Sequence, residues 1–250
     1  MSDAVTEGID AENVASWLNK HVPGVNPPLK YQLIAGGHSN LTYRVEDQEE
    51  NLYVLRRPPL GHVLATAHDM AREHRIISAV GNTDVPVPPT LGVCEDDGVN
   101  GAPFYVMEYV EGEVLHSDAE ATLVPVSERM DLSRQVVEVL AELHAIEPED
   151  IGLGDLAKRE DYLGRQLRRW SRQWEQSKTR ELEAMEEVQD LLERRKPEQI
   201  GSTIVHGDYR LGNMLTRSGR ILAVLDWELC TLGDPLADVG YLLNNWVEPD

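Results

Sequence analysis

Three polar residues near the end of the chain have the types and the spacing that a phosphoryl-transfer site requires. Asp208 follows His206-Gly207, Asn213 comes shortly after it, and Asp226 comes next. Phosphoryl transfer needs one carboxylate to orient a hydroxyl nucleophile and further oxygen ligands to hold magnesium at the phosphates. Mg²⁺ prefers hard oxygen donors and keeps several waters, so a carboxylate, an amide oxygen and phosphates make a typical set. The pattern therefore predicts Asp208 as the base, with Asn213 and Asp226 as ligands of one magnesium ion.

A β-hairpin between the two expected magnesium ligands would bring them together. Residues 214–216 and 221–225 are predicted to be its strands, with the turn centred between Ser218 and Gly219. Facing positions in such a hairpin sum to a constant, here about 437, so Asn213 lies opposite roughly residue 224. Taken alone, either carboxylate could cap a turn and Asn213 could occupy a left-handed corner. Together on one hairpin, the three residues favour a functional site.

The composition narrows the class of protein. The chain has 250 residues, enough for one large domain or two small ones. Its 44 acidic residues against 23 Lys and Arg give a formal charge of −21, which argues against binding to nucleic acid or to anionic lipid. The N-terminus is acidic and no apolar run approaches a membrane span, so a soluble, cytoplasmic protein is expected. Cys94 and Cys230 form no metal-binding or redox motif and are expected to be free thiols.

Most elements of the first 110 residues are predicted to be strands. Strands are expected at 31–34, 41–46, 52–56, 90–94 and 104–109, and helices at 10–20 and about 65–80. Asp10 would cap the first helix, and Gly81-Asn82 would close the second in the manner of a C-terminal glycine cap. A turn is expected at 96–98. This half of the chain is thus predicted to be an antiparallel sheet with one inserted helix.

The remainder is predicted to be mainly helical, with a domain boundary after residue 110. Helices are expected at 127–146, 159–176 and 179–196, the first of them capped by Ser127. Trp170 and Trp174 lie in an apolar stripe of the second helix, which favours simple packing. The third helix is strongly charged and is expected to be solvated. A short strand at 202–206 would deliver Asp208 into a loop.

The segments VHGDYRLGNML and LAVLDWELCTLGDPLADVGYLL carry a family resemblance. The spacing His-x-Asp-x4-Asn is that of a kinase catalytic loop. The chain, from about Tyr31 to Trp246, resembles the aminoglycoside phosphotransferase and choline kinase-like family, particularly the branch fused to or beside acyl-CoA dehydrogenases. The resemblance implies an α+β, bilobal protein-kinase-like fold, with a nucleotide-binding lobe at 1–110 and a catalytic lobe at 111–250. It also implies further helices after residue 250, so either the chain is a C-terminally shortened form or those helices are missing.

The resemblance also implies roles for residues of the catalytic lobe. Asp208 is similar to the family's base, and Asn213 and Asp226 are similar to its metal ligands. His206 resembles a histidine that braces the catalytic loop. The run Asp226-Trp227-Glu228 departs from the Asp-Phe-Gly pattern of protein kinases. A structural acidic pair that steadies the loop is implied at Asp234 and Asp238.

In the first lobe, the resemblance implies a nucleotide-binding set. Arg56 stands where the family has a phosphate-binding lysine, and its planar guanidinium can grip phosphate oxygens. Glu73 would be its partner, although Arg56 could also be a charge on the strand surface. The other expected nucleotide contacts are Ser39 and Asn40, in a loop that could equally be a plain turn, and the hinge residues Glu108, Tyr109 and Val110.

These features predict a small-molecule kinase that uses Mg²⁺ and ATP or GTP to phosphorylate a hydroxyl group. The resemblance allows aminoglycosides, choline-like alcohols, sugars or hydroxyacyl thioesters as acceptors. The acidity favours a cationic acceptor, whereas the branch favours a hydroxyacyl type and a functional link to acyl-CoA dehydrogenases. A catalytically silent pseudokinase, a metal-dependent hydrolase and a non-catalytic interaction protein are the alternatives. The hydrolase would need a second histidine at ligand spacing, which the sequence lacks.

Overall fold

The computed structural model describes residues 6–35, 40–61 and 69–244, which fall into two contact units. The first unit comprises residues up to Val139 together with Leu211–Glu228. The second comprises Leu140–Arg210 and the residues from Leu229 on. The predicted catalytic hairpin therefore shares its contacts with the first unit, while the boundary after residue 110 stays a prediction.

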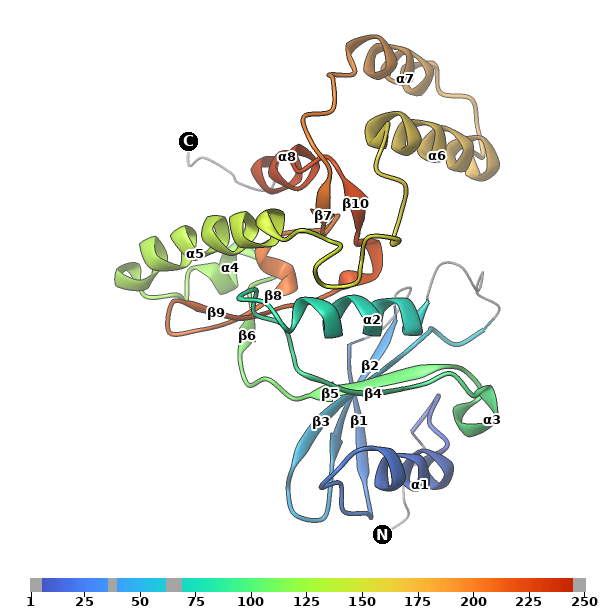
Figure 1. Cartoon of the computed structure of the whole chain (residues 1–250), viewed down its shortest axis with the longest axis vertical. Helices are drawn as coiled ribbons and strands as arrows, with labels where there is room; N and C mark the ends of the chain where they lie inside the picture. The colour runs from blue at the N-terminus through green and yellow to red at the C-terminus, as the bar shows by residue number, and fades with distance from the viewer. Residues whose placement is uncertain (1–5, 36–39, 62–68, 245–250) are drawn as a thin grey trace. The chain divides into compact units, whose positions relative to one another are not determined.

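An antiparallel sheet of five strands forms the centre of the first unit (Figure 1). Its strand order is β1-β2-β3-β5-β4. The strands are β1 (Lys30–Ala35), β2 (Leu41–Glu46), β3 (Leu52–Arg57), β4 (Thr90–Cys94) and β5 (Phe104–Glu108). All neighbouring pairs are antiparallel, which confirms the predicted sheet and most of its strand limits.

The two faces of this sheet carry different helices. Strand β2 buries every second residue, so Tyr43 and its neighbours face a core with helix α1 (Ala11–His21). The capping prediction for α1 is confirmed, because the Asp10 side chain accepts from the backbone N–H of Asn13. Helix α2 (Met70–Val80) packs along β4 and β5. Figure 1 shows α1 and α2 on opposite sides of the sheet.

The limits of α2 and the turn expected at 96–98 differ in part from the predictions. Asp69 caps α2 by accepting from the N–H of Arg72, so the helix begins at Met70; its expected start near 65 falls on residues outside the described part. The helix ends at Val80 with Gly81 as its C-cap, as expected, but Gly81 has a right-handed φ of −61° instead of the left-handed conformation usual for a glycine cap. Its N–H still reaches the Ile77 carbonyl at 2.8 Å, which continues the helical bonding by one residue. The turn expected at 96–98 is instead the start of the short helix α3 (Asp97–Asn100).

The predicted hairpin is confirmed as strands β8 (Met214–Arg217) and β9 (Arg220–Val224). Facing residues sum to 437 near the turn, as in Arg217↔Arg220, and to 438 beyond a bulge. Ser218 and Gly219 both have positive φ, at 51° and 69°, which is typical of a type I′ turn. Strand β6 (Glu113–Val114) pairs with β8, and a short helix α4 (Asp118–Ala121) follows it; neither was predicted.

Helix α5 (Val126–Ala145) runs from the first unit into the second. It begins one residue before Ser127, so the expected cap at Ser127 is wrong, since that residue lies inside the helix. Its apolar stripe is buried, at Leu132, Val136, Leu140 and Leu143. The Gln135 side chain bonds both the Gly219 carbonyl and the Ile221 N–H, which anchors the hairpin turn to α5.

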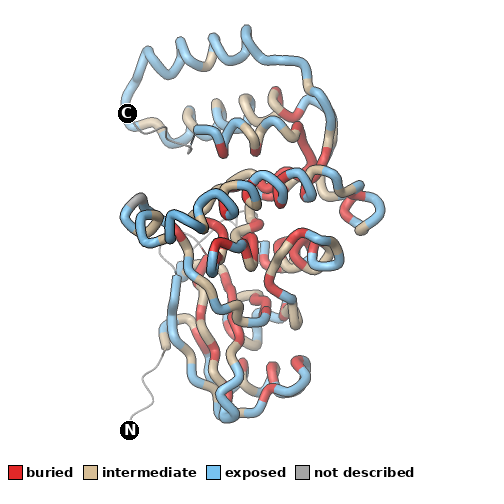
Figure 2. The backbone as a smooth tube through the Cα atoms, turned by 90° about the vertical axis from the view of Figure 1, so that its left-hand side faces the viewer, coloured by how far each residue is buried: buried red, intermediate tan, exposed pale blue. Residues whose placement is uncertain are grey.

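The second unit contains a small sheet and three helices within its described residues. Strands β7 (Thr203–Val205) and β10 (Thr231–Gly233) pair antiparallel. The helices that belong wholly to it are α6 (Tyr162–Ser177), α7 (Glu183–Arg195) and α8 (Leu236–Asn244). None of the residues of α7 is buried, as Figure 2 shows, which confirms the prediction of a solvated helix. Trp170 on α6 is 56% exposed, so the packing role expected for it is wrong in this structure.

No helix in the described part of the chain combines the length and the apolar character needed to cross a membrane.

Candidate active site

The hairpin brings the backbone of Asn213 beside the residue that precedes Asp226. The N–H of Leu225 donates to the Asn213 carbonyl at 2.8 Å, so the strand pairing continues beyond Met214↔Val224. Asp226 follows with a left-handed φ of 65°. Such a conformation is uncommon outside glycine, although aspartate adopts it more readily than most residues, and it is frequent at functional sites. The proximity expected from the hairpin register is thereby confirmed for the backbone, while the metal-binding role stays a prediction.

Arg56 connects strand β3 to the end of this hairpin. Its Nη2 atom donates to Asp226 Oδ1 at 2.6 Å, and its Nε atom lies 3.5 Å from Glu73 Oε2. The side chain is 10% exposed, which excludes the alternative of a surface charge. The structure therefore brings together Arg56, Glu73 and Asp226 within the first unit, although these residues are far apart in sequence.

Burial and charge set the ionisation of this cluster. Burial is the main cause that raises the pKa of Glu73 to about 7; Arg56 opposes the shift, and the nearby Asp226 and Glu228 carboxylates add to it. Burial alone would lower the pKa of Arg56, but Glu73, Tyr105 and Asp226 raise it above its ordinary value. Arg56 therefore stays charged, and three carboxylates surround its single positive charge.

Asn40 and Glu228 complete the cluster. The Asn40 side-chain amide donates to Glu228 Oε2 at 3.1 Å and to Glu73 Oε2 at 3.4 Å. Glu228 lies in the 3-10 turn η2 (Trp227–Leu229), with its carboxylate 3.9 Å from Arg56 Nη2. Glu228 was not predicted as a site residue; the available signal was its place two residues after Asp226, where protein kinases have glycine. The expected contact at Ser39 lies outside the described residues.

The expected hinge residues are partly engaged within the sheet. The N–H of Glu108 donates to Pro89 and the N–H of Tyr109 donates to Leu52. Any pairing of this segment with a nucleobase, including Val110, therefore has to use its other backbone groups, and that role stays a prediction.

In the second unit, Asp238 holds the loop that carries Asp208. The fully buried Asp238 accepts from the backbone N–H groups of His206 and Gly207, each at 2.8 Å. His144 Nε2 lies 3.1 Å from the same carboxylate. His206 Nδ1 in turn accepts from the N–H of Asp208 at 3.2 Å, so the buried His206 braces the loop from inside. These bonds agree with the structural roles that the sequence implied for His206 and Asp238.

Asp234 differs from expectation. It accepts from the N–H groups of Ile200 and Leu236, so it fixes the start of α8 rather than the catalytic loop.

Arg210 contacts the expected base, although it was not predicted as a site residue. It donates from Nε to Asp208 Oδ1 at 3.2 Å. Its signal in the sequence was a cation two residues after the expected base. The pair restricts the orientation of the Asp208 carboxylate.

The residues present fit a magnesium ion by the chemistry of their donor atoms. Asp226 supplies a carboxylate whose side chain is 28% exposed, and Asn213 can supply an amide oxygen. The carboxylates around Arg56 outnumber it, which leaves negative charge for a cation to balance. Among the residues that the structure describes, no group of three or more His, Cys, Asp or Glu side chains is arranged to hold a metal. A magnesium ion here would therefore need phosphate and water oxygens as well.

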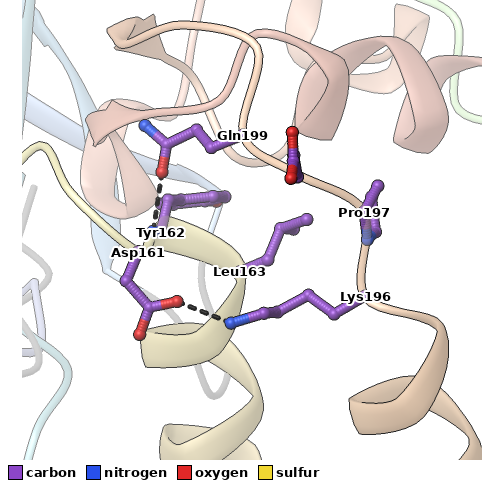
Figure 3. Close-up of a pocket in the computed structure, with 7 residues that line it drawn as sticks. Asp161, Tyr162, Leu163, Lys196, Pro197 and Gln199 are labelled. Carbon is purple, nitrogen blue, oxygen red and sulfur yellow. Dashed lines mark hydrogen bonds and ion pairs between the residues drawn. The ribbon is translucent and has the colours of Figure 1, made fainter.

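A pocket of about 330 Å³ in the second unit lies at the start of α6 (Figure 3). Asp161 lies at its edge and pairs with Lys196 at 2.7 Å, while the side chain of Gln199 accepts from the N–H of Tyr162. None of the residues expected to act on nucleotide or metal lines this pocket. Since the charges of Asp161 and Lys196 are already paired, we assign the pocket no role.

Comparison with known proteins gives relatives of two kinds. Acyl-CoA dehydrogenase family member 10 of Mus musculus is 38% identical over 90% of this chain, and the probable acyl-CoA dehydrogenase IBR3 of Arabidopsis thaliana is 33% identical over 95%. The chain spans only 21% and 30% of the lengths of these relatives. Among solved structures, a Ralstonia eutropha protein provisionally described as an aminoglycoside phosphotransferase is 36% identical, with a TM-score of 0.80. That match covers 97% of this chain and 72% of the other.

More distant structures show the fold alone. The ternary complex of APH(2″)-IIa with streptomycin and ATP has a TM-score of 0.65 at 22% identity, covering 93% of this chain and 75% of that one. The fold is thus the kinase-like fold of the aminoglycoside phosphotransferases, as the sequence predicted. The model of the phosphotransferase enzyme family matches residues 30–250. With a match over this much of its length, the chain belongs to the phosphotransferase enzyme family.

Proposed function

We propose that the chain is a small-molecule kinase that transfers the γ-phosphate of ATP or GTP to a hydroxyl group. The observation that carries the proposal is the bond of 2.6 Å between Arg56 and Asp226, with Glu73 on the other side of the guanidinium. It joins the expected phosphate-binding cation to an expected metal ligand in one buried cluster. The ATP and GDP complexes named for structural neighbours support a nucleoside triphosphate as donor.

Each expected residue has a distinct task in this mechanism. Asp208 accepts a hydrogen bond from the acceptor hydroxyl, aims its oxygen at the phosphorus and takes up the proton as the new bond forms. Arg56 binds phosphate oxygens, and Glu73 keeps the guanidinium in place. Asn213 and Asp226 would hold the magnesium ion, which neutralises developing charge on the phosphates when bound. Most of the rate enhancement then comes from positioning and charge, so Asp208 needs no unusual basicity.

For the acceptor, we propose a hydroxyacyl-type compound, with an aminoglycoside or choline-like alcohol as the other class. The named acyl-CoA dehydrogenase relatives support the first and suggest a functional link to such enzymes. The formal charge of −21 supports a cationic acceptor, because carboxylates attract amines.

Nucleotide consumption across a panel of acceptors tests the proposal. The wild-type chain is incubated with ATP or GTP and Mg²⁺, and diphosphate release is followed with Asp208→Ala alongside. Asp190→Ala, which changes an exposed carboxylate of α7 in the same unit, is the matched control. We expect transfer to one acceptor class, lost by about 10²–10⁴-fold in Asp208→Ala only. Failure of every acceptor, with no stabilisation by nucleotide, refutes the kinase; stabilisation without transfer favours the silent pseudokinase.

A further inference from the structure

Asn40 and Glu228 have contacts that the proposed reaction does not use. Asn40 lies directly before strand β2 and is 3% exposed. At this depth its side-chain amide is shielded from solvent, and its expected contact with the nucleotide stays a prediction. It is instead directed at two carboxylates, those of Glu228 at 3.1 Å and Glu73 at 3.4 Å.

We propose that Asn40 and Glu228 are a pair of positioning residues, a latch that joins the start of β2 to the segment after Asp226. The inference rests on the proposed nucleotide-binding function. Neither residue is assigned a contact with reacting atoms. Their bond fixes the start of β2 relative to Arg56 and Asp226, the residues expected to bind phosphate and metal.

The Glu228 carboxylate lies closer to Asn40 than to Arg56. Glu228 lies 3.9 Å from Arg56 Nη2, too far for a hydrogen bond, whereas Asp226 already holds that nitrogen at 2.6 Å. The amide of Asn40 therefore supplies the shorter polar contact for the Glu228 carboxylate.

The chemistry explains why the latch uses an amide. A lysine at position 40 would also bond two carboxylates, but it would cancel one of their charges. Asparagine satisfies the carboxylate oxygens while leaving the cluster negative. A net negative cluster beside Asp226 favours a divalent cation there. The latch thus fixes the start of β2 without weakening the attraction for magnesium.

Binding of MgATP and MgGTP, measured by isothermal titration calorimetry, tests the latch without any acceptor. The variants are Asn40→Ala, Glu228→Ala, their double mutant and Glu228→Gln, which keeps an oxygen that can accept from Asn40. The exposed pair Asn26 and Glu49, whose amide–carboxylate bond is also 3.1 Å, supplies matched alanine controls in the same unit. Thermal denaturation reports whether each variant folds. If Asn40→Ala does not fold, the variants of the partly exposed Glu228 still test the latch.

We expect each alanine variant to weaken nucleotide binding about tenfold, the ratio that corresponds to losing one hydrogen bond to a charged group. The double mutant should be no weaker than either single variant, since both remove the same bond. Glu228→Gln should bind more tightly than Glu228→Ala. The latch is refuted if the alanine variants bind nucleotide like wild type, or if the affinity loss of the double mutant equals the product of the two single losses. Neither result would refute the proposed kinase function. A wild-type chain that binds neither nucleotide refutes the proposed function as well.

Discussion

Replacing Glu73 by glutamine should change how the stability of the protein depends on pH. Glu73 is 1% exposed, and burial raises its pKa from the ordinary 4.5 to about 7. The folded state therefore holds the proton more tightly than the unfolded state does. The stabilisation from this carboxyl is fully present below its unfolded pKa, and it is lost as the pH rises through about 7. The glutamine side chain of the variant would have no proton to lose over this range.

The size of the effect follows from the two pKa values. Their difference, about 2.5, corresponds to about 3 kcal/mol of unfolding free energy. Relative to Glu73→Gln, wild type should thus lose about 3 kcal/mol between roughly pH 4.5 and pH 7.5, with most of the change between the two pKa values. All other titrating groups are common to both proteins and largely cancel in the difference.

Urea denaturation of wild type and Glu73→Gln at closely spaced pH values measures this difference. Glu95→Gln, at an exposed position of the same unit, controls for the loss of one carboxylate. The reasoning is refuted by a free-energy difference that stays constant over the whole range. That result would mean that Arg56, 3.5 Å away, keeps Glu73 ionised in spite of its burial.

Four further substitutions test the loop, the hairpin and the cluster. Asp238→Asn turns one acceptor oxygen into a donor that faces backbone N–H groups, so we expect a loss of about 2–3 kcal/mol in thermal denaturation; an unchanged melting temperature would contradict the bracing role. Gly219→Ala should cost about 1–3 kcal/mol in urea denaturation, because φ is 69° and a Cβ would lie 2.9 Å from that of Glu128. Ser218→Gly, at the neighbouring turn position, should instead stabilise the hairpin by up to about 1 kcal/mol. Equal changes in unfolding free energy for the two variants would argue against the type I′ turn. Arg56→Lys keeps the charge but cannot contact Glu73 and Asp226 with a fork, so MgATP binding in a thermal-shift titration should weaken about tenfold, and unaltered binding would show that charge alone suffices.

The sequence predicted the features that depend on local patterns. Ser218-Gly219 between two apolar runs was enough to place the hairpin turn, because that turn type asks for positive φ at both residues. The left-handed cap at Gly81 failed for the converse reason, since a glycine permits that conformation without requiring it. The exposure of Trp170 could not be derived from a helical stripe, because periodicity shows which face is apolar and not what covers it.

The ionisation of the cluster around Arg56 lies beyond any local pattern. Arg56 and Asp226 are 170 positions apart, and only the family resemblance related them before the fold was known. Glu228 is bound to the cluster by a hydrogen bond from Asn40, which lies 188 positions away in the sequence. Three carboxylates and one guanidinium at close range are costly to keep buried unless protons or cations balance them. The same excess of negative charge raises the pKa of Glu73 and attracts a magnesium ion beside Asp226. Binding of the cation should therefore displace the Glu73 proton and lower the pKa of Glu73.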